Sequence, residues 1–164
     1  MTVVQTEAPS AMPRIFLVVV DESDELKVAL RYACRRARRT GGRVALLYVI
    51  DTDDDGQWMG VKELMREEKR AEAEALLMKV AAEVEPMAGS LPVVYIREGR
   101  RREALLELID EDPSISILVL AASTSPDGPG PLISYLAGKY SHRLKVPVTI
   151  VPGSLTDAQI AALA

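Results

Sequence analysis

The chain has 164 residues, 48% of them hydrophobic and 27% charged, and its formal net charge is −4. This length and composition predict one globular domain, exclude wholesale disorder and argue against a nucleic-acid binder. The one cysteine, Cys34, has no partner for an internal disulfide, which fits a reducing compartment.

The first 13 residues, MTVVQTEAPSAMP, are expected to form a flexible lead-in to the domain. They lack the cationic start and the long apolar segment of a secretory signal peptide. No apolar run in the chain approaches the roughly 20 residues needed to cross a bilayer. We therefore expect a cytoplasmic protein without a membrane segment.

Five short apolar runs that are rich in β-branched residues predict β-strands. They cover residues 14–20, 43–50, 92–96, 116–121 and 146–151. The first, second and fourth runs (RIFLVVV, RVALLYVI and SILVLA) are nearly continuous in apolar residues instead of alternating. This pattern is typical of parallel strands that helices cover on both faces.

Segments with helical spacing of apolar residues alternate with these strands. They cover residues 24–40, 61–85, 101–111 and 132–144, and a last short helix lies within LTDAQIAALA at the C-terminus. The expected helix starts are Ser23 or Asp24 for the first helix and Thr156 or Asp157 for the last. Gly41, Pro86 and Pro113 are expected to end the first three helices.

The alternation of strands and helices predicts an α/β fold, a three-layer doubly wound domain with a parallel five-stranded sheet. We expect the strand order 3-2-1-4-5, one domain over residues 14–152 and a C-terminal helical tail over residues 153–164. Ligands of such sheets bind at the carboxyl ends of the strands where the strand order reverses, here between the first and fourth strands.

Several segments resemble the universal stress protein family, in order and with compatible spacing. They are FLVVVDESDELKVALRYACRRARRTGGRVALLYVI, VVYIREG and the later pair ILVLA and GKYSHRLKVPVTIVP. The resemblance covers about residues 14–152. It implies a cytoplasmic stress-response domain, often dimeric, whose nucleotide-binding members hold ATP in the switch-point cleft.

The edge strand from Val146 to Val151 is apolar and therefore needs cover. The resemblance suggests that it pairs with its mate in a homodimer, and an unknown regulatory protein is a second possible partner. The C-terminal helix either adds to the dimer contact or folds back on the domain.

By resemblance, four residues would contact an adenine nucleotide. Asp21 would face the ribose or adenine, Val19 and Leu120 would flank the base, and Val49 would offer main-chain atoms to the edge of adenine. The residues themselves allow a structural alternative, in which Asp21 caps the first helix and the three apolar residues belong to the core.

The nucleotide-binding members share a loop pattern of Gly, two residues, Gly, nine residues, and Gly followed by Ser or Thr. Gly128 and Gly138 have the nine-residue gap, but Ser125 then takes the place of the first glycine and Lys139 that of the hydroxyl residue. Alignment at the strand end puts Ala121 in the first glycine's place instead. A left-handed conformation there would strain Ala121 by roughly 1–2 kcal/mol.

The loop segment DGPGP offers amides at Asp127, Gly128 and Gly130 and none at Pro129 or Pro131. Two lost amide bonds to a charged oxygen cost on the order of 3–6 kcal/mol, which Lys139 offsets in part as a point charge on phosphate. The sequence therefore predicts weak or absent adenine-nucleotide binding, with AMP, another small adenine compound or no ligand favoured over ATP and its Mg²⁺; in the last case the loop is a proline-stiffened turn that caps the last helix. The alternative is a genuine ATP binder with slow hydrolysis that uses Lys139.

No catalytic or metal-binding residues are predicted. His142, the one histidine, has no nucleophile arrangement around it, and the acidic run DTDDDGQW over residues 51–58 lacks the spacing of a calcium loop. An arginine cluster on the cleft rim suggests either an anion site or a surface patch; it consists of Arg97, Arg100, Arg101 and Arg102. A second set, expected to form a solvated helix face, consists of Arg31, Arg35, Arg36, Arg38 and Arg39.

Overall fold

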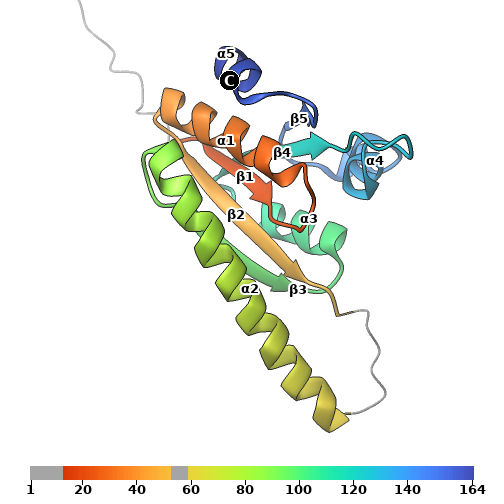
Figure 1. Cartoon of the computed structure of the whole chain (residues 1–164). Coiled ribbons are helices and arrows are strands. Elements are labelled where there is room, and N and C mark those ends of the chain that lie inside the picture. Colours follow the sequence, from red (N-terminus) through yellow and green to blue (C-terminus); the bar gives the residue numbers. More distant parts are fainter. Residues whose placement is uncertain (1–12, 53–58) are drawn as a thin grey trace, which may run out of the picture.

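The computed structural model describes residues 13–52 and 59–164 and shows one parallel sheet of five strands (Figure 1). The strands are β1 (Ile15–Val19), β2 (Arg43–Ile50), β3 (Val93–Glu98), β4 (Ile115–Ala122) and β5 (Val148–Pro152). Their order is β3-β2-β1-β4-β5, and every neighbouring pair is parallel. The predicted fold class and strand order are therefore confirmed.

Helices cover both faces of the sheet (Figure 1). They are α1 (Leu26–Thr40), α2 (Met59–Ala88), α3 (Arg101–Glu111), α4 (Pro131–Ala137), the 3₁₀ turn η1 (Ser141–Arg143) and α5 (Asp157–Leu163). One core lies between the sheet and α1, α2 and α5, and a second core lies between the sheet and α3 and α4. None of the described helices is both long and apolar enough to span a membrane.

The central strand β1 contributes to both cores. Phe16 and Val18 are buried with α1 and α2, while Leu17 and Val19 are buried with α3 and α4. Because successive side chains of a strand point to opposite faces, burial on both faces requires the unbroken apolar run seen in the sequence. On α1, Cys34 is fully buried, and this burial raises the pKa of its thiol to about 12. Cys34 is therefore a small hydrophobic core residue.

The predicted end of the second helix is wrong, because α2 continues past Pro86 to Ala88. Pro86 has no N–H to donate to the carbonyl of Ala82, but the residues after it still complete the last turn of α2. In addition, Arg38 on α1 donates to the carbonyl oxygens of Pro86 (3.1 Å) and Met87 (3.2 Å). The last turn of α2 thus gains a partner from a neighbouring helix.

The predicted helix over residues 132–144 is broken in two. α4 ends at Ala137, and the chain resumes as the 3₁₀ turn at Ser141. Gly138 between them has φ −98° and ψ −131°, and a Cβ built there would lie 2.8 Å from the carbonyl oxygen of Ser134. The glycine therefore allows a close approach that ends α4 after two turns.

The two predicted N-caps have different outcomes. The N-cap of α1 is Glu25, without a side-chain hydrogen bond, so the prediction of Ser23 or Asp24 is wrong. Ser23 is held in a turn by Asp21 before α1 begins. Thr156 caps α5 as predicted, in a capping box in which its hydroxyl accepts from the amide of Gln159 at 3.3 Å.

The C-terminal segment folds back on α1. Ile160 of α5 is fully buried in the core beneath α1, and Arg31 of α1 forms an ion pair with Asp157. Arg39 of α1 donates to the carbonyl oxygens of Ala161 (2.8 Å) and Ala164. Arg38 and Arg39 are exposed and Arg31 is half-exposed, as expected for a solvated face, but all three also bind neighbouring helices: Arg38 binds α2, and Arg31 and Arg39 bind α5.

A polar cluster fixes the junction between the end of α3 and the start of β4. Asp112 accepts hydrogen bonds from the amide of Ser114 (3.0 Å), the hydroxyl of Ser114 and the hydroxyl of Tyr95. The bond from the Ser114 hydroxyl, followed by that from Tyr95, holds the pKa of Asp112 below its usual value. Burial and the bond to Asp112 raise the pKa of Tyr95 to about 12.

Replacing Asp112 by Asn should lower the free energy of unfolding at pH 7 by about 1–2 kcal/mol, because donors at Ser114 and Tyr95 lose a charged acceptor. A lowered carboxyl pKa stabilises the fold above about pH 4 and ceases to do so as the pH falls through the folded-state value. The deficit of Asp112→Asn in urea unfolding should therefore shrink toward pH 2. Asp110→Asn, at an exposed position, is the control and should stay within about 0.5 kcal/mol of the parent. A deficit independent of pH would contradict the assignment.

Candidate ligand-binding site

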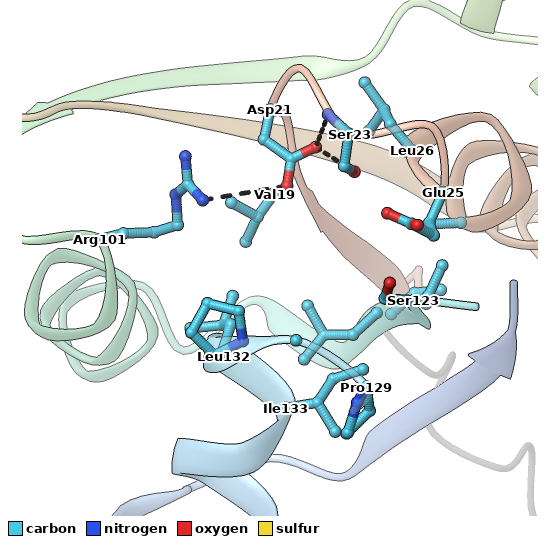
Figure 2. Close-up of a pocket in the computed structure, with 16 residues that line it drawn as sticks. Val19, Asp21, Ser23, Glu25, Leu26, Arg101, Ser123, Pro129, Leu132 and Ile133 are labelled. Atoms are coloured by element: carbon cyan, nitrogen blue, oxygen red, sulfur yellow. Dashed lines mark hydrogen bonds and ion pairs between the residues drawn. The ribbon is translucent and has the colours of Figure 1, made fainter. Parts of the chain in front are cut away.

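A cavity of about 300 Å³ lies at the carboxyl ends of β1 and β4, where the strand order reverses (Figure 2). The segment after β1 and the start of α1 form one wall, and Arg101 at the start of α3 lies on the rim. The loop after β4 and the first turn of α4 close the opposite side with Pro129, Gly130 and Pro131. The place is the one predicted from the strand order.

Five residues predicted for the site line this cavity. They are Val19, Asp21, Leu120, Ala121 and Gly130. Val19 and Leu120 are each 7% exposed, so they contribute to the core and to the cavity wall together. Ala121 lies in β4, and no non-glycine residue in the described part of the chain has a positive φ. The strain that one alignment of the loop implied for Ala121 therefore does not arise.

Four predicted residues lie away from the cavity lining. Val49 is buried in β2, Gly128 lies in the loop with φ 117°, and Gly138 follows α4. Lys139 is exposed, and its Nζ lies 5.9 Å from the ring centre of Tyr140. The structure thus brings the strand ends together with Gly130 but leaves Lys139 on the surface.

Lys139 belongs to a stack of cations and aromatic rings that holds α4 against α3. The rings of Tyr135 and Tyr140 stack with their centres 4.4 Å apart, and the guanidinium of Arg102 lies 4.7 Å from the centre of Tyr135. Such contacts favour a cation over a ring face. They give Lys139 and Arg102 partners outside the cavity.

The amides of the loop between β4 and α4 are mostly used within the loop. The amide of Ser123 donates to the carbonyl of Pro129 (3.0 Å), and that of Gly128 donates to the carbonyl of Ser125 (3.3 Å). The amides of Ser125 and Asp127 donate to serine hydroxyls, at 3.1 and 3.2 Å. The expectation that Asp127 and Gly128 offer amides to a phosphate is therefore wrong, because the turn consumes both.

What the loop presents to the cavity is largely prolyl ring. Pro129 and Pro131 line it and have no N–H, and Pro131 also removes a donor from the first turn of α4. The other lining residues of the loop are Gly130, which has an amide, and Ser123, whose amide donates to the carbonyl of Pro129 and whose hydroxyl faces the same space. This wall is apolar where a phosphate site needs converging donors.

The carboxylate of Asp21 is held by its own turn. Its Oδ1 accepts from the amide of Ser23 at 2.9 Å and from the Ser23 hydroxyl at 2.5 Å, and its Oδ2 lies 4.0 Å from Nη1 of Arg101. Asp21 therefore has a structural role, as the alternative to ligand contact predicted, but it stabilises a turn before α1 and does not cap the helix. The same carboxylate faces the cavity (Figure 2).

Glu25 is a cavity residue that the sequence did not reveal. It is the N-cap of α1, and its carboxylate points into the cavity beside Ser123 (Figure 2). Its position in the sequence could have identified it, because the first helix of a doubly wound sheet begins at the carboxyl end of β1, next to the ligand cleft. Ser23, Leu26, Ala29 and Ile133 are further lining residues that were not singled out.

The remaining candidates are outside the cavity. His142 is exposed, with its Nδ1 3.1 Å from the carbonyl of Lys139, and no group of three or more His, Cys, Asp or Glu residues in the described ranges is arranged to hold a metal ion. Of the rim arginines, Arg101 lines the cavity, whereas Arg97 pairs with Glu111 at 3.5 Å. The acidic run falls largely on residues 53–58, outside the described residues.

The fold and the cavity define a doubly wound α/β domain with a ligand cleft at its switch point. The family model described as the Universal stress protein family matches residues 12–152, and the chain belongs to this family. No protein with curated functional information matches the sequence.

Solved structures share the fold at low sequence identity. The universal stress protein UspA from Lactobacillus plantarum is 22% identical with a TM-score of 0.72, and the match covers 86% of this chain and 99% of that one. A universal stress protein in complex with cAMP is 18% identical (TM-score 0.60; 88% and 100% covered). A family protein from Arabidopsis thaliana with AMP bound is 17% identical (TM-score 0.58; 85% and 92% covered).

Replacing Asp21 by Ala should lower the free energy of unfolding by about 1 kcal/mol, because the turn loses the acceptor of two hydrogen bonds. Arg101→Ala should cost less than about 0.5 kcal/mol, because a half-exposed ion pair at 4.0 Å contributes little. Urea unfolding of both variants measures the difference. An equal loss in Arg101→Ala would mean that the ion pair, and not the turn, holds Asp21.

Proposed function

We propose that this protein is a non-catalytic, dimeric stress-response module of the cytoplasm whose cavity holds a small adenine compound weakly, in preference to ATP. Membership of the universal stress protein family supports the stress-response role. Two structural neighbours that are described with cAMP and with AMP support an adenine compound as the ligand class.

The observation that carries the ligand preference is the state of the loop after β4. Two of its amides, at Asp127 and Gly128, are hydrogen-bonded within the loop, and Pro129 and Pro131 have none to offer. Each missing hydrogen bond to a charged oxygen costs about 1.5–3 kcal/mol of binding free energy, so the loop binds a triphosphate only weakly. The apolar walls formed by Val19, Leu120 and Leu132 are unaffected and suit a flat base.

The size of the cavity agrees with a small ligand. A volume of about 300 Å³ is at the lower end of the range for small-molecule pockets. The lining residues include no histidine, cysteine or lysine, and Asp21 accepts two hydrogen bonds from Ser23 within its own turn. No base and nucleophile in the lining form a hydrogen-bonded pair aimed at a ligand in the described part of the chain, which supports a binding role over hydrolysis.

The proposed dimer forms through β5. This strand pairs with β4 on one side and is the last strand of the sheet, and its Ile150 is 44% exposed. Free strand edges with apolar side chains are covered in stable proteins, and a second copy of the same strand is a suitable cover. A regulatory protein that adds a strand to this edge is the other proposed partner.

Ligand binding is tested by thermal unfolding and calorimetric titration with AMP, adenosine and ATP with Mg²⁺. We expect AMP and adenosine to raise the Tm at millimolar concentration and ATP to have a smaller effect. Leu132→Trp, which fills the cavity, should abolish the shift, while Leu91→Trp, at a position 55% exposed and outside the lining, should not. ATP that co-purifies and binds saturably at micromolar concentration would contradict the proposal.

The dimer is tested by sedimentation of Ile150→Lys. A charge at the centre of β5 should convert the dimer to a monomer, because the apolar edge would have to bury an ammonium group. Leu163→Lys on α5, where Leu163 is 66% exposed, is the matched control and should remain dimeric. A parent protein that sediments as a monomer would refute this part of the proposal.

A further inference from the structure

Glu25 places a carboxylate among the residues that line the cavity. Its backbone carbonyl accepts from the amides of Val28 (3.0 Å) and Ala29 (3.2 Å), which fixes the residue at the start of α1. Its carboxylate forms no hydrogen bond or ion pair within residues 13–52 and 59–164 for which contacts are described. In Figure 2 it points toward the space between Ser123 and Asp21.

Gly153 leaves the room in which the Glu25 side chain lies. A Cβ built at Gly153 would be 3.1 Å from Cγ of Glu25 and 2.1 Å from the carbonyl oxygen of Ala122. The glycine directly after β5 therefore lets the chain pass close to the end of β4 and leaves space for the Glu25 side chain.

The charges that line the cavity are unbalanced. They belong to Asp21, Glu25 and Arg101, so two negative groups face one positive group. Nη1 of Arg101 lies 4.0 Å from Oδ2 of Asp21, so the positive charge of Arg101 mainly compensates the charge of Asp21. The charge of Glu25 then accounts for the net negative charge of the lining. A phosphate group entering this space meets net repulsion, whereas hydroxyl or amino groups of a ligand find acceptors.

We propose that Glu25 is a specificity-determining residue that selects against phosphate, so that the cavity prefers an uncharged nucleoside to its mono-, di- and triphosphates. This inference rests on the proposed binding of an adenine compound and names the ligand class within it. The sugar hydroxyls donate to the Glu25 carboxylate, and the base lies between the apolar walls at Val19 and Leu120. Each added phosphate weakens binding.

The test compares adenosine, AMP and ATP without Mg²⁺ by calorimetry at low salt, for the parent protein and for Glu25→Gln. The parent should bind adenosine most tightly and ATP least. Glu25→Gln should bind AMP and ATP roughly three- to tenfold more tightly, as expected for removing one nearby charge at intermediate dielectric. Its affinity for adenosine should be unchanged or lower, because a carboxylate acceptor is lost.

Glu22→Gln is the matched control. It changes the net charge by the same amount three residues away, but Glu22 is exposed and outside the cavity lining. It should leave all three affinities unchanged. A similar gain in both variants would mean that overall charge, and not Glu25, sets the preference.

Salt provides a second readout that needs no variant. Raising ionic strength screens the repulsion, so AMP affinity of the parent protein should increase with salt, opposite to the behaviour of a cationic phosphate site. AMP or ATP binding more tightly than adenosine, with affinity that falls with salt, would overturn the role of Glu25 and leave the adenine-binding function standing. Failure of all three compounds to bind would overturn both.

Discussion

Burial of the central strand on both faces is the constraint on which the rest of this structure depends. β1 is covered by α1 and α2 on one side and by α3 and α4 on the other, so the crossovers from β1 and β4 diverge to opposite faces of the sheet. Nothing can fill the gap between the two strand ends except side chains from the diverging segments. The cavity at Asp21 and Ala121 is a direct consequence of this topology.

The chemistry of that cavity is decided by the segments that enclose it. A loop that satisfies its own amides and presents prolyl rings offers little to an anion, and a helix start that carries Glu25 opposes one. Both features act in the same direction as the surface position of Lys139, which stacks on Tyr140. The family fold is thus retained while the charge of its cleft differs from that of a phosphate site.

The low sequence identity to the solved relatives is consistent with a retained fold and a changed cleft. A match of 22% identity with a TM-score of 0.72 means that the fold is shared while most individual residues are not. Core positions tolerate exchange among aliphatic residues as long as volume and pattern are kept. Residues at the strand ends are free of that requirement, so they can change the ligand without changing the fold.

The sequence alone determined the elements whose formation depends on local pattern. The continuous apolar strands and the extent of α3 were predicted from it, and of the two candidate caps of α5, Thr156 and Asp157, the structure has Thr156. The order of the sheet was predicted from the alternation of strands and helices together with the topology of doubly wound folds. The family resemblance also directed attention to Asp21 and Leu120, which do line the cavity.

Contacts between distant segments were decided by tertiary structure alone. α2 continues past Pro86, and its last turn is bound by Arg38, 48 residues away. Glu25 lies in the segment predicted to be the first helix, and only the packed structure places it at the cavity and next to Gly153, which follows another strand. Local propensity acts over a few residues, whereas the partners of a backbone carbonyl or a carboxylate are fixed only when the layers pack together.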